Sequence, residues 1–346
     1  MSVGWNERSQ PMKVYAYAER IALADLRVLE RPDPLPGAHD VVLRMRAAAL
    51  NYRDLAIARG NYHVGVAPPL VPVSDGAGEV IAVGAQVTRF RPGDLACPVY
   101  LPDWIDGPVS PRVARRRLGG PSDGVLAEFM CVNEEAAVRA PSHLAPEEAA
   151  TLPVTAVTAW HALYQNACVR PGETVLVQGA GGVSTAAMQL ARAGGARVIA
   201  LTRGTRHVER LRALGIDDVV TTGDTADWPA QVVSLTGGGV DVAVDVAGGP
   251  SLARSIAATR TGGRVHLVGY AADTTATIDI FDAIRHATTI HVATAGSRQS
   301  FEALVRVLQM QAIRPVVGKV FPVADVRVAL QHLSDGGHTG KVVLTF

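Results

Sequence analysis

The pattern of hydrophobic and polar residues changes near Glu173. Before that residue, short apolar stretches between Pro/Gly turns are typical of β-strands, and the clearest are 41–46, 79–83 and 126–132. After it, apolar runs that predict buried strands alternate with amphipathic stretches that predict helices. The strands are predicted at 174–178, 196–201, 218–221, 240–245, 263–268 and 289–295, and the clearest helices at 182–194, 205–214, 250–258 and 279–286. This alternation predicts an α/β domain on a doubly wound, parallel six-stranded sheet.

Further elements flank this alternating domain. A helix is predicted to begin at Pro146, since proline suits the first helical position, to break near Pro153 and to resume over 158–163. We expect the C-terminal elements to return to the β-rich first region. They are a long amphipathic helix after Arg298, another helix at 324–333 and a closing strand at 341–346.

Composition narrows the class of protein. With 346 residues the chain is long enough for two domains, and its net charge of +1 argues against nucleic acid or an anionic membrane as a partner. No run approaches the roughly 18 apolar residues of a membrane span, and the polar residues 1–11 predict a solvated arm rather than a signal peptide. Cys97, Cys131 and Cys168 are isolated from one another, which argues against a disulfide framework. We therefore expect a cytoplasmic protein.

A glycine turn joins the first predicted strand of the alternating domain to its helix. Gly179, Gly181 and Gly182 let the backbone turn tightly, and Val183 and Ser184 follow them at the start of the helix. Backbone N–H groups and the positive end of a helix dipole bind a pyrophosphate at such a place. Ser184 stands where the usual motif has its last glycine, and the alternative is a glycine turn that binds no ligand. Six strands favour a dinucleotide over a mononucleotide.

Several motifs in a fixed order resemble those of one family. They are Gly76-Ala-Gly-Glu-Val-Ile-Ala-Val-Gly84, Arg91-Pro-Gly-Asp94, Leu152-Pro-Val-Thr-Ala-Val-Thr-Ala-Trp160, the glycine turn and His338-Thr-Gly-Lys-Val-Val343. From about Met12 to Phe346 the chain resembles the medium-chain dehydrogenase/reductase superfamily. The resemblance implies a GroES-like catalytic and substrate domain at 1–154 and 297–346, and a Rossmann NADP(H)-binding domain at 155–296. It also implies a homodimer that pairs the last Rossmann strand, 290–295, across a twofold axis.

The resemblance also bears on metal binding. Zinc enzymes of the family hold their catalytic metal with Cys, His or a nearby Glu, and a second Cys, but the matching positions here carry Asn51, Ser74-Asp75 and Val154. One carboxylate among these does not make a tetrahedral zinc site. The segment after Cys97 also lacks the cysteines of the family's structural-zinc lobe. We therefore expect no metal and a place in the zinc-independent branch, which includes quinone oxidoreductases, 2-alkenal reductases and enoyl reductases.

NADPH is the expected cofactor. An Asp or Glu at the end of the second Rossmann strand would bond the ribose 2′-OH of NADH, but no acid follows Ala200 before Glu209. Thr202 and Arg203 can bind a 2′-phosphate, and His207 stands where related reductases often hold a lysine. The alternative is that Arg203 and Arg206 belong to a solvated, arginine-rich loop. By resemblance, the residues around the nicotinamide are Asn51, Thr158, Val246, Ala247, Val268, Gly269, Tyr270, Thr294 and Ala295.

Without zinc, hydrogen bonds must polarise the substrate's carbonyl oxygen. Tyr52 is the first candidate donor, because it follows the position of the lost cysteine ligand, and Tyr62 and His63 are the next. The alternative for Tyr62 is a half-buried packing tyrosine, and for His63 a surface histidine. Arg53 replaces the hydroxyl of the zinc enzymes' proton relay, and Asp54 and Asp75 are expected to fix backbone and ribose contacts rather than to move protons.

The leading hypothesis is an NADPH-dependent, zinc-independent oxidoreductase that reduces a quinone or the C=C of an α,β-unsaturated carbonyl. A second hypothesis is a zinc-independent carbonyl or alcohol oxidoreductase of the same fold. A third, from another class, is an NADPH-binding protein without catalysis. All three expect a small-molecule ligand, no nucleic-acid or membrane partner, and a homodimer. Trp104 and the 100–118 loop cap the substrate pocket or form a surface lid away from it.

Overall fold

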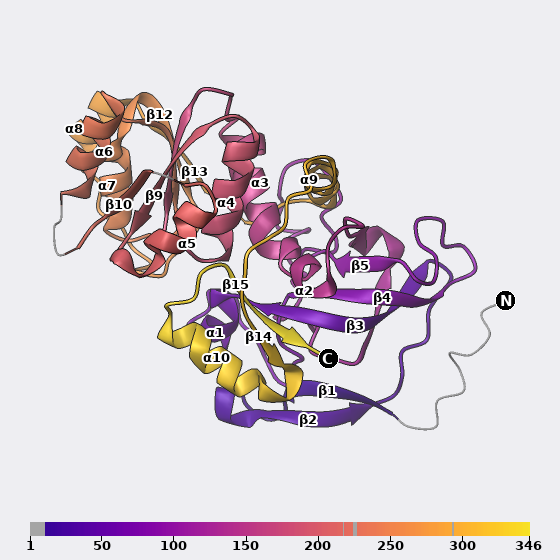
Figure 1. Cartoon of the computed structure of the whole chain (residues 1–346). Helices are drawn as coiled ribbons and strands as arrows, with labels where there is room; N and C mark the ends of the chain where they lie inside the picture. The colour runs from indigo at the N-terminus through magenta and orange to yellow at the C-terminus, as the bar shows by residue number, and fades with distance from the viewer. Residues whose placement is uncertain (1–10, 217, 224–226, 293) are drawn as a thin grey trace. The chain divides into compact units, whose positions relative to one another are not determined.

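The computed structural model describes residues 11–216, 218–223, 227–292 and 294–346 (Figure 1), so most of the predicted N-terminal arm lies outside the described residues. The chain divides into two compact units, Met1–Val154 with Gly296–Phe346, and Thr155–Ala295. The first break falls where the sequence predicts it, and the second differs by one residue, Gly296. Each unit has its own sheet and its own buried core.

The first unit is built on a seven-stranded sheet. Its main path runs β14-β15-β3-β4-β5-β7, and β6 pairs with β3 outside that path. The strands are β3 (Asp40–Leu50), β4 (Asp75–Val83), β5 (Leu95–Pro98), β6 (Phe129–Asn133), β7 (Ala137–Arg139), β14 (Val317–Pro322) and β15 (Lys341–Thr345). A separate antiparallel pair is formed by β1 (Met12–Tyr17) and β2 (Leu26–Arg31).

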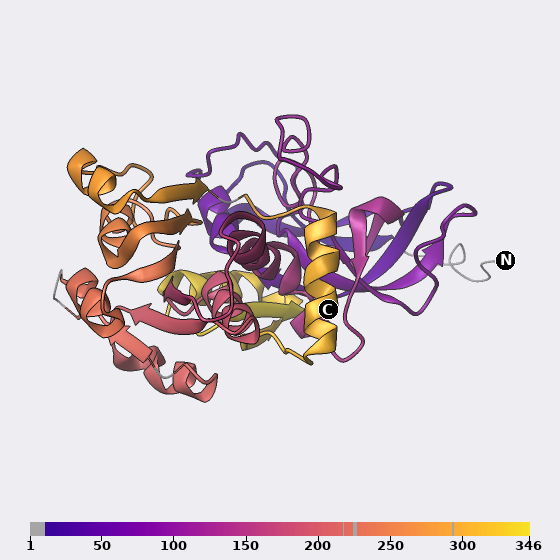
Figure 2. The same ribbon diagram turned by 90° about the horizontal axis from the view of Figure 1, so that it is seen from above.

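The C-terminal strand returns to this first sheet, as the sequence predicts. β15 pairs antiparallel with β3, so that Val342 lies opposite Leu50 and Thr345 opposite Ala47. The amphipathic helix α10 (Val326–Asp335) buries Val326, Ala329 and Leu330 in the same core. The other helices of this unit are α1 (Tyr52–Ala58), α2 (Pro146–Ala149) and α9 (Arg298–Met310), which is golden in Figure 2 and packs against β7.

The second unit is a doubly wound α/β domain. Its six parallel strands have the order β10-β9-β8-β11-β12-β13, so the direction of winding reverses between β8 and β11. The strands are β8 (Thr174–Gln178), β9 (Arg197–Thr202), β10 (Asp218–Thr221), β11 (Val240–Asp245), β12 (Thr259–Leu267) and β13 (Thr289–Val292). All six predicted strands are present, and the fold class is confirmed. β12 begins four residues earlier than predicted, because Gly262 and Gly263 are accommodated within the strand instead of forming a turn before it.

Helices cover this sheet on both faces, which the alternating pattern predicts. They are α4 (Gly182–Ala193), α5 (Val208–Ala213), α6 (Trp228–Thr236), α7 (Ser251–Ala258) and α8 (Ile280–His286). The short helix α3 (Val157–Trp160) is flanked by wider π-helical turns at Leu152–Ala156 and His161–Asn166. α6 lies outside the clearest predictions, because Pro229 near its start and three consecutive glycines after its end resemble a loop. No helix in the described ranges is both long and apolar enough to cross a membrane.

Candidate active site

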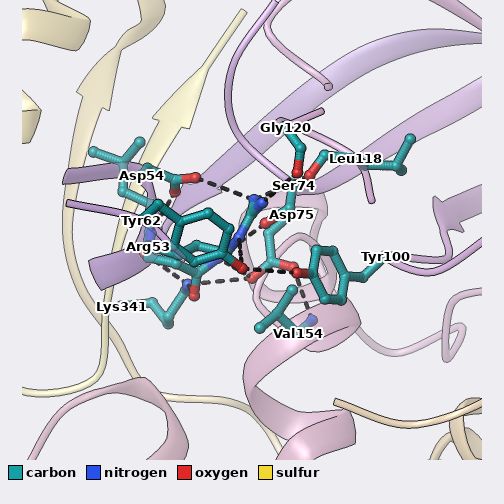
Figure 3. A network of polar contacts seen from close by, with 12 residues as sticks. Arg53, Asp54, Tyr62, Ser74, Asp75, Tyr100, Leu118, Gly120, Val154 and Lys341 are labelled. Carbon is teal, nitrogen blue, oxygen red and sulfur yellow. Dashed lines mark hydrogen bonds and ion pairs between the residues drawn. The ribbon is translucent and has the colours of Figure 1, made fainter. Parts of the chain in front are cut away.

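In the first unit, the positions that the family resemblance matches to zinc ligands are linked by hydrogen bonds, and Figure 3 shows Ser74, Asp75 and Val154 among them. Asn51 Nδ2 donates to Asp75 Oδ2 at 2.9 Å and lies 3.5 Å from Ser74 Oγ. The backbone N–H of Val154 donates to the other carboxylate oxygen, Asp75 Oδ1, at 2.8 Å. Asn51, Ser74 and Asp75 are all buried. The end of β3, the start of β4 and the turn after α2 therefore meet at one carboxylate.

Lys341, at the start of β15, completes this cluster. Its ammonium group donates to Leu50 O at 2.6 Å, to Asn51 Oδ1 at 2.6 Å and to Asp75 Oδ2 at 3.2 Å. Three acceptors match the three N–H bonds of an ammonium, so this geometry holds the charged form of the side chain. Lys341 and Asp75 are 4 % and 0 % exposed, which makes them a buried ion pair.

Burial acts on both partners of this pair. It raises the pKa of Asp75, while the Lys341 ammonium and the hydrogen bonds from Asn51 and Val154 act in the opposite direction. Burial also lowers the pKa of Lys341, against the attraction of Asp75 and Asp54. Lys341 belongs to the motif His338-Thr-Gly-Lys-Val-Val343, but its place in this cluster is not predicted from the sequence. Its signal in the sequence is a charged residue at the start of an apolar strand, Lys341-Val-Val-Leu344.

Asp54 fixes the start of α1, in agreement with the predicted backbone role of this residue. Its Oδ2 accepts the backbone N–H of Asn51 at 2.7 Å, and its Oδ1 lies 3.7 Å from the Arg53 guanidinium. Complete burial raises the pKa of Asp54 to about 6, although Arg53, the Asn51 N–H and Lys341 favour the ionised form. Asp75 likewise accepts a backbone N–H, from Val154. Both acids are therefore bonded to the chain's own groups.

Arg53 holds the loop that precedes β6. It is 7 % exposed and donates to Leu118 O and Gly120 O, each at 3.0 Å. Its Nε lies 3.4 Å from the hydroxyl of Tyr62. The guanidinium carbon also lies 5.0 Å from the ring centroids of both Tyr62 and Tyr100, within the range of a cation–π contact. Arg53, at the position of the zinc enzymes' proton relay, therefore has a structural role, and it also contacts the phenol rings of Tyr62 and Tyr100.

The three predicted catalytic residues have different surroundings. Tyr62 is half-buried, its hydroxyl lies 3.3 Å from that of Tyr100, and its ring centroid lies 4.4 Å from that of His63. His63 is exposed on part of its surface, and the burial of the rest, followed by the charges of Arg117 and Arg53, lowers its pKa. Tyr52 opens α1 and is 46 % exposed. Tyr62 thus contacts His63, Arg53 and Tyr100, and the sequence does not predict the part of Tyr100.

Trp104 is buried within the 100–118 loop. It is 2 % exposed, and its Nε1 donates to Gly107 O at 2.9 Å, so the indole is bonded within its own loop. The loop is also attached to α9, because the backbone N–H of Arg298 donates to Trp104 O. Whether the 100–118 loop caps the substrate pocket or is a surface lid away from it stays a prediction.

The glycine turn of the second unit has room for a ligand. Gly181 is the residue before α4, no side chain caps this helix, and a Cβ added at Gly181 would meet no atom within 4 Å. Gly179 has a φ of 75°, the left-handed conformation that favours glycine. Uncapped N–H groups at the start of a twelve-residue helix, with open space before them, fit the pyrophosphate of a dinucleotide.

A buried network of hydrogen bonds supports the glycine turn. The Ser184 hydroxyl donates to Gln178 O at 2.6 Å, so this side chain locks the turn from within. Gln178 Nε2 donates to Ser255 Oγ at 2.8 Å, and Ser255 Oγ donates to Asp245 Oδ2 at 2.8 Å. The other oxygen of Asp245 accepts the backbone N–H groups of Ala247 and Gly248. Sequence reasoning missed this network; its signal is the pair of polar residues that end two apolar strands, Gln178 and Asp245.

At the end of β9, Arg203 is exposed and forms no hydrogen bond or ion pair with a described residue. Thr202 is 3 % exposed, and its hydroxyl donates to Gly204 O at 2.8 Å. The hydroxyl is thus engaged within the loop, so Arg203 is the better-placed group for a phosphate. His207 is half-buried, and burial, followed by the charge of Arg206, lowers its pKa.

The residues predicted around the nicotinamide lie after strands of the second sheet, with two exceptions. Val246 and Ala247 follow β11, Val268, Gly269 and Tyr270 follow β12, and Thr294 and Ala295 follow β13. Thr158 is buried on α3, and Asn51 belongs to the first unit. Gly269 approaches β11 so closely that an added Cβ would lie 1.9 Å from Val246 O, so only glycine fits there. Within the described residues, no group of three or more His, Cys, Asp or Glu side chains is arranged to hold a metal ion.

Replacing Lys341 by methionine leaves the Asp75 carboxylate buried without its cation. We expect Lys341→Met to lower the free energy of unfolding by about 3–5 kcal/mol, measured by urea denaturation. In Lys341→Met/Asp75→Asn, residue 75 is neutral and still accepts the Val154 N–H, so we expect a smaller loss than in the single variant. The exposed Lys319→Met is the matched control and should change stability by about 1 kcal/mol or less. A single variant as stable as the wild type would contradict this account of the buried pair.

Comparison with known proteins agrees with this architecture. The family profile described as "Alcohol dehydrogenase GroES-like domain" matches residues 37–142, and that described as "Zinc-binding dehydrogenase" matches 182–310. A zinc-type alcohol dehydrogenase-like protein of Schizosaccharomyces pombe is 35% identical over 317 residues, which cover 89% of this chain and 91% of the relative. The acryloyl-coenzyme A reductase of Metallosphaera sedula is 30% identical, over 92% of this chain and 96% of the relative.

A solved structure is similar over nearly the whole chain. It is a protein of Sinorhizobium meliloti 1021 assigned to the alcohol dehydrogenases, with a TM-score of 0.92 and 36% identity over 98% of this chain and 100% of that one. A GroES-like domain, a Rossmann sheet and full-length relatives above 30% identity agree with one another. The chain belongs to the medium-chain dehydrogenase/reductase superfamily, whose members bind nicotinamide cofactors, and it is an oxidoreductase of that family.

Proposed function

We propose that this oxidoreductase uses NADPH to reduce, without a metal ion, a C=C bond conjugated to a carbonyl group or a quinone. The observation that carries the proposal is the Asn51–Asp75–Lys341 cluster. It offers a metal no thiolate or imidazole, and its one carboxylate is already paired with an ammonium that would repel a divalent cation. The relation to an acryloyl-coenzyme A reductase supports reduction of a C=C bond conjugated to a carbonyl.

A bound nicotinamide cofactor supplies the hydride. This chain's residues must then stabilise the negative charge that develops on the substrate's carbonyl or quinone oxygen as the bond is reduced. Tyr62 is the best-placed donor for that oxygen, since Arg53 holds its hydroxyl at 3.4 Å and leaves the phenolic hydrogen available. The Tyr100 hydroxyl lies 3.3 Å from the Tyr62 hydroxyl, and a bound substrate oxygen would replace it as the acceptor of the Tyr62 hydrogen. Solvent returns the proton afterwards.

The preference for NADPH is argued from the end of β9. No carboxylate follows this strand before Glu209, so nothing there repels a 2′-phosphate or bonds a 2′-OH. Arg203 is exposed and unpaired among the described residues, and its planar guanidinium suits a phosphate. The uncapped start of α4 fits the pyrophosphate of the same dinucleotide.

The test of the function is oxidation of NADPH with enones, quinones and aldehydes, with a chelator present throughout and the products identified. We expect turnover of enones or quinones at a rate that the chelator does not change, with the C=C of the enone reduced. Reduction of the C=O instead would identify a carbonyl oxidoreductase of the same fold. Tight NADPH binding without turnover of any acceptor would point to a protein without catalysis.

The proton-donor role of Tyr62 is tested on the same substrates. Tyr62→Phe removes the hydroxyl that Arg53 holds, and we expect kcat to fall by about 10²-fold, the usual scale of general acid catalysis. Tyr52→Phe is the matched control, since Tyr52 is a more exposed tyrosine nearby in sequence. A larger effect at Tyr52 than at Tyr62 would transfer the role to Tyr52.

For the cofactor, we expect Arg203→Ala to weaken NADPH binding at least ten-fold and to leave NADH binding unchanged, measured by calorimetric titration. The reason is that only the 2′-phosphate distinguishes the two nucleotides. Arg210→Ala, a change of an exposed arginine on the following helix, is the control and should change neither affinity. Equal binding of NADPH and NADH to the wild type would contradict the proposed preference.

We also propose that the protein is a homodimer that pairs its β13 strands. β13 is the last strand of its sheet, and Ile290 and Val292 on it are 38 % and 71 % exposed. An unpaired apolar edge of this kind is covered when a second copy adds its strand. Light scattering should give twice the mass of one chain for the wild type and a smaller mass for Val292→Asp. A wild type with the mass of a single chain would refute the dimer.

A further inference from the structure

Tyr100 is a buried tyrosine whose hydroxyl has a single partner. It is 5 % exposed, and its hydroxyl lies 3.3 Å from that of Tyr62, as Figure 3 shows. Among the residues that the structure describes, no other group is hydrogen-bonded to the Tyr100 hydroxyl. Tyr62, by contrast, is half-buried. The pair therefore joins a phenol that is partly accessible to one that the protein encloses.

Arg53 and Leu118 hold this pair of phenols in place. The backbone carbonyl of Tyr100 accepts the N–H of Leu118 at 3.1 Å, and the carbonyl of Leu118 accepts a hydrogen bond from Arg53 at 3.0 Å. The guanidinium carbon of Arg53 lies 5.0 Å from the centroid of each phenol ring, within the range of a cation–π contact. Its Nε lies 3.4 Å from the Tyr62 hydroxyl. The two hydroxyls are therefore kept within hydrogen-bond reach of each other.

The oxygen of Tyr62 can accept a hydrogen bond from each of its two neighbours. A phenolic oxygen carries one hydrogen and has acceptor capacity besides. The Nε–H of Arg53 uses part of that capacity, and the Tyr100 hydroxyl is the other described group that is hydrogen-bonded to this oxygen. When the hydrogen of Tyr62 points to a substrate oxygen, the hydrogen of Tyr100 is free to point to Tyr62. The hydrogen bond between the two phenols can therefore reverse its direction.

Burial determines that Tyr100 keeps its own proton. It raises the pKa of Tyr100 far above the ordinary value for a tyrosine, while the charge of Arg53 acts in the opposite direction. Tyr100 therefore remains protonated at neutral pH and can donate. A hydrogen bond to an ionised oxygen is stronger than one to a neutral oxygen, so a donor beside Tyr62 stabilises it most when Tyr62 has lost its proton.

From this arrangement we propose that Tyr100 is a positioning residue for the proton transfer, whose hydroxyl donates to the Tyr62 oxygen as Tyr62 gives its own proton to the substrate. The proposal rests on the proposed function, in which the substrate gains a hydride on carbon and negative charge on oxygen. The O–H bond of Tyr62 breaks, a new O–H bond forms on the substrate oxygen, and Tyr62 is left as a phenolate that accepts from Arg53 and Tyr100. Solvent then returns a proton to Tyr62.

The test is Tyr100→Phe, which removes the hydroxyl and keeps the ring that lies against Arg53. We expect kcat to fall by about ten-fold with KM unchanged, the scale of one lost hydrogen bond to a charged group. The solvent deuterium isotope effect on kcat should rise, because the proton transfer is the step that becomes slower. In the Tyr62→Phe background the same change should not lower kcat further, because no phenolate forms at residue 62. Tyr17→Phe is the matched control, since Tyr17 is also buried in this unit but is not bonded to Tyr62, and it should leave kcat unchanged.

Three results would overturn the proposal. They are a kcat that Tyr100→Phe does not lower, an equal further loss in the Tyr62→Phe background, and an unchanged isotope effect, of which the last two would mean a purely structural role. If no enone or quinone is turned over, the proposed function fails on its own.

Binding then tests Tyr100 separately, by thermal shift in the presence of NADP⁺. The probe is 4-nitrophenolate, whose charged oxygen accepts a hydrogen bond from Tyr62, and nitrobenzene is its neutral analogue. Stabilisation of the wild type by 4-nitrophenolate, reduced both in Tyr100→Phe and in Tyr62→Phe while the effect of nitrobenzene stays the same, would sustain the proposal. Any other result would refute it.

Discussion

The candidate site of the first unit depends on one buried ion pair, between Lys341 and Asp75. Three segments far apart in the sequence end at this pair: the end of β3 through Asn51, the turn after α2 through Val154, and the start of β15 through Lys341 itself. A charge without its partner in such a place costs several kcal/mol, so the folded chain is held to an arrangement in which all three segments arrive together. The C-terminal strand is therefore required for the site as well as for the sheet.

The buried acids of both units share a physical role. Asp54 accepts the N–H of Asn51, Asp75 that of Val154, and Asp245 those of Ala247 and Gly248. Each is 2 % exposed or less. These acids accept hydrogen bonds from backbone N–H groups that the turns leave without a partner in a helix or strand. A carboxylate suits this role because it has two oxygens that can accept. These carboxylates thus hold turns in place, and the hydroxyl of Tyr62 remains for a ligand.

Much of the architecture could be predicted from the sequence, because it depends on repeating patterns. Alternating apolar runs predict the parallel sheet, and ordered motifs place Asn51, Asp75 and Val154 at one position of a known fold. The contacts that complete the site have no such pattern. Lys341 reaches Asn51 across 290 positions, and Arg53 is bonded to the carbonyls of Leu118 and Gly120, groups that every residue carries. The hydroxyls of Thr202 and Ser184 likewise turn to nearby carbonyls, and the sequence does not tell this from a ligand contact.

The positions of the charged side chains in the first unit favour reduction of an enone or a quinone. Reduction of an enone or a quinone by hydride places negative charge on an oxygen atom, and an ionised carboxylate beside that oxygen would oppose the reaction. Here Asp75 is neutralised by Lys341, and Asp54 is buried with a pKa near 6 and lies behind Arg53. The phenol of Tyr62 is contacted by Arg53, His63 and Tyr100. An arrangement in which the acids are bonded to the chain's own groups, while a phenol that an arginine contacts remains available, favours a product oxygen that becomes negative before it is protonated.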